Sequence, residues 1–84
     1  MTDTQTHRLQ RLRAPGYMQE MVFFVECHMV HIHYFYNGVR SDYWNWEGQA
    51  FDGSNNRVTI DHARYMWDKM VGNGWSRVTE QQPA

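Results

Sequence analysis

The chain has 84 residues, of which 42% are hydrophobic and 15% aromatic, and its formal net charge is −1. This length is typical of a single domain, and the apolar content excludes a chain that is disordered throughout. The near-neutral charge disfavours a protein that binds nucleic acid mainly through a basic surface. The single cysteine, Cys27, excludes an internal disulfide.

The first residues are polar and basic. Residues 1–16 end in Pro15-Gly16 and contain Arg8, Arg11 and Arg13. The segment HRLQRLR is long enough for one or two helical turns, and so short a helix is marginal without tertiary support. We predict a flexible basic arm over residues 1–16, which is either a frayed tail or a segment that orders on an acidic partner.

Residues 17–36 are dense in Val, Ile, Phe and Tyr, which is typical of strands. The run is long for one strand, so we expect either one bent strand or two strands that meet near Cys27–His28. Asn37-Gly38 predicts a two-residue hairpin turn, because both residues tolerate a positive φ. A second strand is then expected over residues 39–47.

The predicted hairpin places alternate residues on two faces. In its register Tyr36 faces Val39, His33 faces Asp42 and His31 faces Trp44. A helix can cover only one side of this hairpin. We expect the other side to be an exposed interaction surface, because it retains large apolar and aromatic groups. The residues assigned to this interface are Val30, Ile32, Tyr34, Tyr36 and Tyr43.

A helix is predicted over residues 60–72. Thr59 suits the N-cap, and Asp61 lies in the first turn, where the helix dipole favours an acid. Gly72-Asn73-Gly74 provides the stop, and Trp75 is expected to fold back onto the helix or sheet. Before the helix, Gly48 breaks the second strand and residues 52–56 form a loop. The predicted apolar stripe consists of Ala63, Met66, Trp67, Met70 and Val71.

These elements predict an α+β fold in which the helix packs on one face of an antiparallel sheet of three or four strands. Residues 17–78 form the single domain, Val78 starts a closing edge strand, and residues 79–84 form a polar tail. The apolar stretch MVFFV is far too short to span a bilayer, and no signal core precedes it. We therefore expect a cytoplasmic protein that does not associate with membranes.

The C-terminal quarter, residues 59–78, resembles the end of small uncharacterised proteins of cyanobacteria and cyanophages. The shared pattern is Ala-x3-Trp-x3-aliphatic-x2-Gly-Trp followed by a basic residue. The matching positions are Ala63, Trp67, Val71, Gly74, Trp75 and Arg77. The resemblance implies a compact strand-rich unit closed by a helix, and it implies no activity. It also suggests a cyanobacterial or cyanophage source.

The histidines are the first candidate site. His31 and His33 share one strand face, with Asp42 opposite, and two histidines with one carboxylate can bind iron or zinc. Histidines that only pack or hydrogen-bond are the preferred interpretation, because no third imidazole is placed by the spacing. We therefore expect no metal and no cofactor, and we retain a metal-binding module as an alternative function.

The aromatic residues are the second candidate site. Tyr34, Tyr36 and Tyr43 gather on the hairpin, and Tyr is enriched at protein interfaces. Stacking on single-stranded nucleic acid is a further alternative, although Arg40 is the only basic residue nearby. We expect a non-enzymatic interaction or regulatory protein, with another protein or a second copy of itself as partner and no small-molecule substrate. A phage-encoded modulator of a host protein is consistent with its size.

Overall fold

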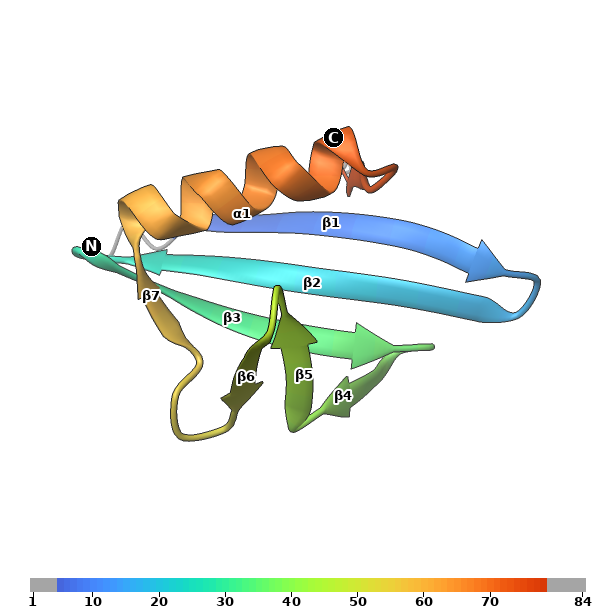
Figure 1. Cartoon of the computed structure of the whole chain (residues 1–84), viewed down its shortest axis with the longest axis horizontal. Coiled ribbons are helices and arrows are strands. Elements are labelled where there is room, and N and C mark those ends of the chain that lie inside the picture. The colour runs from blue at the N-terminus through green and yellow to red at the C-terminus, as the bar shows by residue number, and fades with distance from the viewer. Residues whose placement is uncertain (1–4, 79–84) are drawn as a thin grey trace, which may run out of the picture.

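Eight strands and one helix make up the part of the chain that the computed structural model describes, residues 5–78 (Figure 1). The first four strands are β1 (Gln5–Ala14), β2 (Tyr17–Glu26), β3 (Met29–Tyr36) and β4 (Val39–Ser41). They are followed by β5 (Tyr43–Trp46), β6 (Gln49–Asp52) and β7 (Arg57–Thr59). The helix α1 (Ile60–Gly72) and the strand β8 (Ser76–Val78) complete the chain order.

The strands form one six-stranded antiparallel sheet and a separate two-stranded hairpin. The large sheet has the order β4-β3-β2-β1-β8, and β7 pairs with β3. Strand β4 pairs with the end of β3, whereas β7 pairs with its beginning, so the two short strands share one edge. The hairpin consists of β5 and β6. The α+β class is confirmed, but the expected three or four strands are too few.

Strand β1 lies inside the sheet, between β2 and β8. Its sequence alternates, and Leu9 is fully buried between more polar neighbours. The prediction of a flexible arm is therefore wrong over residues 5–14, because pairing on both sides turns a polar segment into an ordered strand. Residues 1–4 and the predicted tail, residues 79–84, lie outside the described residues.

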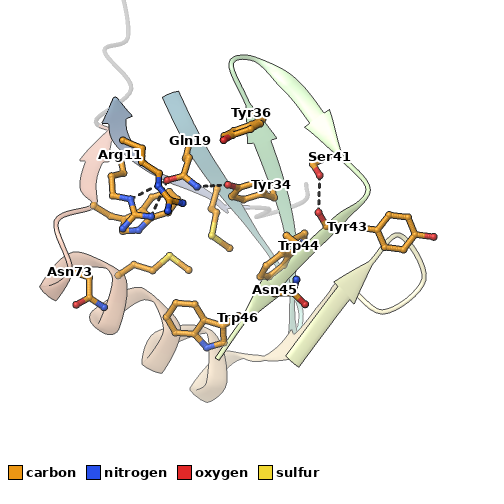
Figure 2. Close-up of a pocket in the computed structure, with 14 residues that line it drawn as sticks. Arg11, Gln19, Tyr34, Tyr36, Ser41, Tyr43, Trp44, Asn45, Trp46 and Asn73 are labelled. Carbon is orange, nitrogen blue, oxygen red and sulfur yellow. Dashed lines mark hydrogen bonds between the residues drawn. The ribbon is translucent and has the colours of Figure 1, made fainter. Parts of the chain in front are cut away.

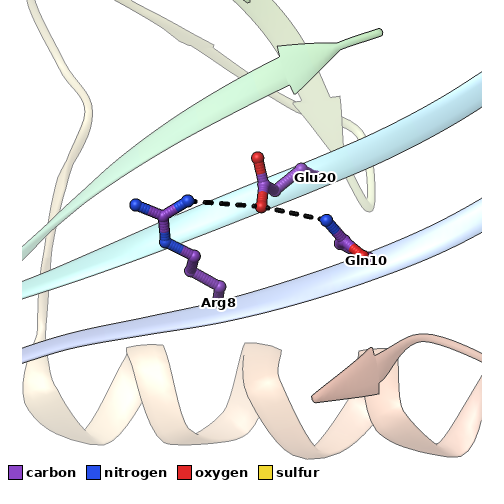
Figure 3. A network of polar contacts seen from close by, with 3 residues as sticks. All are labelled: Arg8, Gln10 and Glu20. Atoms are coloured by element: carbon purple, nitrogen blue, oxygen red, sulfur yellow. Dashed lines mark hydrogen bonds and ion pairs between the residues drawn. The ribbon is translucent and has the colours of Figure 1, made fainter. Parts of the chain in front are cut away.

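The three arginines of the predicted arm are divided between the two faces of the sheet. Arg8 lies on the face opposite the helix, where its Nη1 is 3.6 Å from Oε2 of Glu20 (Figure 3). The same oxygen accepts a hydrogen bond of 3.2 Å from the Gln10 side chain. Arg11 lies on the other face, against the helix end, and its guanidinium is 5.0 Å from the centroid of the Trp75 ring.

Two-residue turns at Pro15–Gly16, Cys27–His28 and Asn37–Gly38 connect the strands β1 to β4. Asn37 and Gly38 have φ values of 51° and 82°, as a type I′ turn requires, and Tyr36 pairs with Val39 as predicted. Of the two alternatives near Cys27–His28, one bent strand or two strands, the structure has two: β2 ends at Glu26 and β3 begins at Met29. Cys27 is exposed there with a φ of 57°. The chain therefore reverses where the sequence contains no Gly, Asn or Pro.

The helix begins and ends as predicted. The Thr59 side chain accepts a hydrogen bond of 3.2 Å from the His62 amide, and the helix runs to Gly72. After it, the Trp75 amide donates to the Met70 carbonyl at 3.0 Å, and the indole is buried. The buried helix residues are Ala63, Met66 and Met70. Val71 is 43% exposed, so it does not belong to the buried stripe.

The core lies between one face of the sheet and two covering elements, α1 and the β5–β6 hairpin. It contains Leu9 of β1, Phe23 of β2 and Ile32 of β3, together with Met66 of the helix and Phe51 of β6. The sheet face that carries Val30 and Ile32 is therefore the covered one. In the described residues, no helix is long and apolar enough to cross a membrane.

Candidate binding cleft

An open cleft exists because the helix is shorter than the strands that it covers. Thirteen helical residues extend about 20 Å, whereas a strand of ten residues extends about 33 Å. The helix axis runs roughly along β1 and β2 and ends before the β1–β2 turn (Figure 1). The sheet beyond the helix end is left uncovered. A cleft of about 740 Å³ lies there.

The cleft is bounded by three parts of the chain (Figure 2). Its floor is formed by Gln19 and Met21 of β2 and by Tyr34 and Tyr36 of β3. One wall comes from the end of the helix and the residues after it, and the opposite wall from β4 and β5. The wall residues are Met70, Asn73 and Trp75 on one side and Ser41, Tyr43, Trp44, Asn45 and Trp46 on the other. Arg11 and Arg13 of β1 complete the lining.

A series of aromatic rings runs through the floor of the cleft into the core. The Tyr17 and Tyr36 ring centroids are 4.6 Å apart, and Tyr34 stacks on Tyr36 at 6.2 Å. Tyr34 also stacks on Trp44 at 6.3 Å, and Trp44 lies on Phe51 at 4.1 Å with an interplanar angle of 8°. We call Tyr17, Tyr36, Tyr34, Trp44 and Phe51 the aromatic ladder. Its inner end is buried and its outer end is open to solvent.

A hydrogen-bonded amide holds the middle of the ladder in place. Gln19 is only 6% exposed, and its amide nitrogen donates to the Tyr34 hydroxyl. Its amide oxygen accepts from Nε and Nη2 of Arg11 at 3.1 and 3.0 Å. A buried amide is costly unless its polar atoms are paired, and here both are. Gln19 therefore fixes the positions of an aromatic ring and a cation in the cleft.

The open end of the ladder contains a perturbed phenol. A hydrogen bond with Tyr17 is the largest of the causes that raise the pKa of Tyr36 to about 12, and burial and the phenols of Tyr17 and Tyr34 add to it. The charge of Arg13 acts in the opposite direction. Tyr36 is therefore a neutral hydrogen-bonding group at physiological pH.

The charge of the cleft is positive. Arg11 and Arg13 line it, and none of its described lining residues is acidic. The register of β1 against β2 shifts between Leu12 and Ala14, so Arg13 is not paired with a residue of β2. Such a β-bulge changes the direction of the side chain. The cleft therefore combines tyrosine and tryptophan rings with two guanidinium groups.

Polar contacts tie the β5–β6 wall to the helix. Glu47, in the turn of this hairpin, lies 3.4 Å from Nζ of Lys69 and accepts a hydrogen bond of 3.2 Å from Tyr65. The hydrogen bond to Glu47 is the main reason why the pKa of Lys69 is raised. These groups are exposed, so the contacts contribute more to alignment than to stability.

The predicted interface residues occupy different environments. Tyr34 and Tyr36 lie in the cleft floor, but Val30 and Ile32 are 2% and 0% exposed in the core. The prediction that this face is opposite the helix is therefore wrong. Tyr43 is 75% exposed, and its ring points away from the other aromatic residues (Figure 2). Trp44, Trp46 and Trp75 also line the cleft, and none of them was predicted from the sequence to belong to a binding site.

The histidine candidates do not form a ligand set with Asp42. The predicted strand over 39–47 stops at Ser41, and the beginning of β3 pairs with β7 instead, so His31 faces Arg57. His31 Nε2 lies 3.2 Å from Glu26, and His33 packs edge-on against Phe24. Burial, followed by the charges of Arg40 and His31, lowers the pKa of His33. Within residues 5–78, no three His, Cys, Asp or Glu side chains are grouped to hold a metal.

Comparison with known proteins gives no relative to guide the assignment: no family model matches the chain, and neither a curated protein nor a solved structure is significantly similar to it.

Proposed function

We propose that this is a non-enzymatic protein-interaction module whose cleft binds an extended segment of another protein. The observation that carries the proposal is the composition of the cleft. Tyr34, Tyr36 and Trp46 line it together with Arg11 and Arg13, and Trp, Tyr and Arg dominate the residues on which binding energy depends. In the setting that the sequence resemblance suggests, the partner is a host protein in the cytoplasm of a cyanobacterium.

The shape of the cleft supports an extended segment as the ligand. The cleft is open, and it lies between a helix end and a hairpin (Figure 2). Grooves lined with aromatic residues bind extended peptides by stacking on side chains such as proline. The two arginines and the absence of acidic residues in the described lining favour a segment that carries Asp or Glu.

Selection from a random peptide library on the purified full chain tests the proposal. We expect enrichment of acidic peptides that contain proline or aromatic residues. Tyr36→Ser should lower the affinity for the selected peptide by at least about tenfold, as expected for loss of a central aromatic contact. Leu12→Ser is the control, because Leu12 is an exposed apolar residue of β1 that does not line the cleft. Equal effects of the two variants, or no enrichment, would contradict the proposal.

Single-stranded nucleic acid is a second candidate ligand, favoured by the regular stacking of Tyr36, Tyr34 and Trp44 beside two arginines. Bases stack on such rings without regard to sequence. Trp44 is 8% exposed, however, so of these three rings only Tyr36 and Tyr34 are accessible. Fluorescence anisotropy with an oligo-dT probe tests this candidate. If the cleft binds single-stranded nucleic acid, the affinity for the probe falls steeply as the salt concentration is raised.

A further inference from the structure

A second pocket lies at the other end of the contact between helix and sheet. Its volume is about 390 Å³, and it lies between the first half of α1 and the strands beneath. This is near the lower end of the size range of small-molecule sites, roughly 300–1,000 Å³. The pocket shares no lining residue with the cleft, so a ligand bound in it is independent of the proposed function.

The interior of this pocket is apolar. Phe23, Val30 and Ala63 are buried at its base. Trp67, which is partly buried, forms an aromatic wall, and its ring centroid lies 5.2 Å from that of Phe23 at an angle of 76°. Val25 and Ile60 complete the apolar lining. A ligand placed here would cover apolar surface that the helix leaves partly open.

Three basic side chains from three different elements surround the opening. His7 comes from β1, Arg64 from α1 and Arg77 from β8, and all three are exposed. The Arg77 guanidinium lies 6.0 Å from the centroid of the Trp67 ring. The centroids of the His7 and Trp67 rings are also 6.0 Å apart. Among the described residues that line the pocket, none is acidic. The charge at the opening therefore favours an anion.

We propose that this pocket binds a small amphipathic anion, an aliphatic chain that ends in a carboxylate. The chain lies against Phe23, Val30 and Trp67, and the carboxylate lies between Arg64 and Arg77. Guanidinium groups pair well with carboxylates, and an apolar pocket with a few convergent polar groups is the usual form of a ligand site. No small-molecule ligand was predicted from the sequence, in which Ala63 and Trp67 were assigned to the apolar stripe of the helix.

The probe for this site is decanoate, titrated into the full chain below its micelle concentration and followed by two-dimensional amide NMR. We expect saturable shifts at Phe23, Ala63 and Trp67. The double variant Arg64→Gln/Arg77→Gln should weaken binding at least about tenfold, since hydrogen bonds to charged groups are lost. Both arginines are exposed, so the variant should fold, which circular dichroism verifies.

Two controls separate this site from unspecific adsorption. Arg57→Gln removes an exposed arginine on the opposite sheet face and should change affinity by no more than roughly twofold. Decyltrimethylammonium has the same chain with the opposite charge and should bind more weakly than decanoate. The proposal is overturned by equal binding of both probes, by an unaffected double variant, by absence of saturable binding, or by shifts confined to the cleft. It is also overturned if an acidic peptide shifts these amides when decanoate does not.

Discussion

At the scale of single residues, Gln19 connects stability with the cleft. Its amide is buried, and both its polar ends are used, one by Tyr34 and the other by Arg11. Arg11 in turn lies over Trp75, so the amide links β1, β2, β3 and the segment after the helix. A change at this position affects four parts of the chain at once.

We expect Gln19→Leu to lower the free energy of unfolding by about 1–3 kcal/mol, because it leaves partly buried polar groups of Arg11 and Tyr34 without their partner. Urea denaturation measures this. Gln49→Leu, at an exposed glutamine of β6, is the control and should stay within about 0.5 kcal/mol of the original protein. Equal stabilities of the two variants would show that the amide does not organise the cleft.

Tyr17→Phe should return the pKa of Tyr36 toward its ordinary value of 10, because the hydrogen bond with Tyr17 is the main cause of the raised value of about 12. A pKa that is higher in the folded state stabilises the protein below pH 10, and this contribution disappears as the pH rises from 10 to about 12. Absorbance titration of tyrosinate measures the shift. A phenol that still ionises near pH 12 in the Tyr17→Phe variant would contradict this assignment.

At the scale of elements, the helix holds the fold together through one narrow stripe. Met66 is fully buried, whereas Val71 of the same helix is 43% exposed. We expect Met66→Ala to cost about 2–5 kcal/mol and Val71→Ala to cost less than about 1 kcal/mol. Thermal unfolding compares the two. Similar melting temperatures would mean that the helix does not pack on the sheet through this stripe.

Elements with local chemical signals were predicted from the sequence, and those without were not. Thr59 caps the helix as its side chain allows, and Asn37-Gly38 forms the predicted turn. The turn at Cys27–His28 has no such signal, because Cys27 adopts a left-handed conformation that its side chain does not favour. Strand β1 was missed for a different reason. Pro15–Gly16 joins it to β2 in a hairpin, but its mostly polar residues were interpreted as a tail, and it is ordered by pairing with β2 and β8.

The cleft was predicted only in part, because it depends on which face the helix covers. Tyr34 and Tyr36 were assigned to an interface, and both line the cleft. Their strand neighbours Val30 and Ile32 share the same face, yet they are buried in the core. The helix covers one half of β3 and leaves the other, and this boundary depends on helix length relative to strand length. The alternation of residues along a strand does not show where this boundary lies.

At the scale of the whole molecule, the parts differ in how many neighbours support them. Strand β2 is paired along its length with β1 and β3, whereas the β5–β6 hairpin pairs only within itself and is held by Trp44 and Phe51. A two-stranded hairpin is marginal by itself. We expect the amides of β2 to exchange with solvent much more slowly than those of β5 and β6 in hydrogen-exchange NMR. Equal protection would indicate a cleft wall as rigid as the sheet.

The pairing of β8 with β1 also has a consequence for how the chain is made. Strands β1 to β4 are neighbours in both sequence and space, so their hairpins can form while synthesis continues. The outer edge of β1, however, can pair only after Ser76–Val78 has been synthesised. A nascent chain that stalls in the helix would hold an ordered sheet with one open edge, the kind of surface on which chains aggregate. The edge of β1 is therefore protected only when β8 has been synthesised and has paired with it.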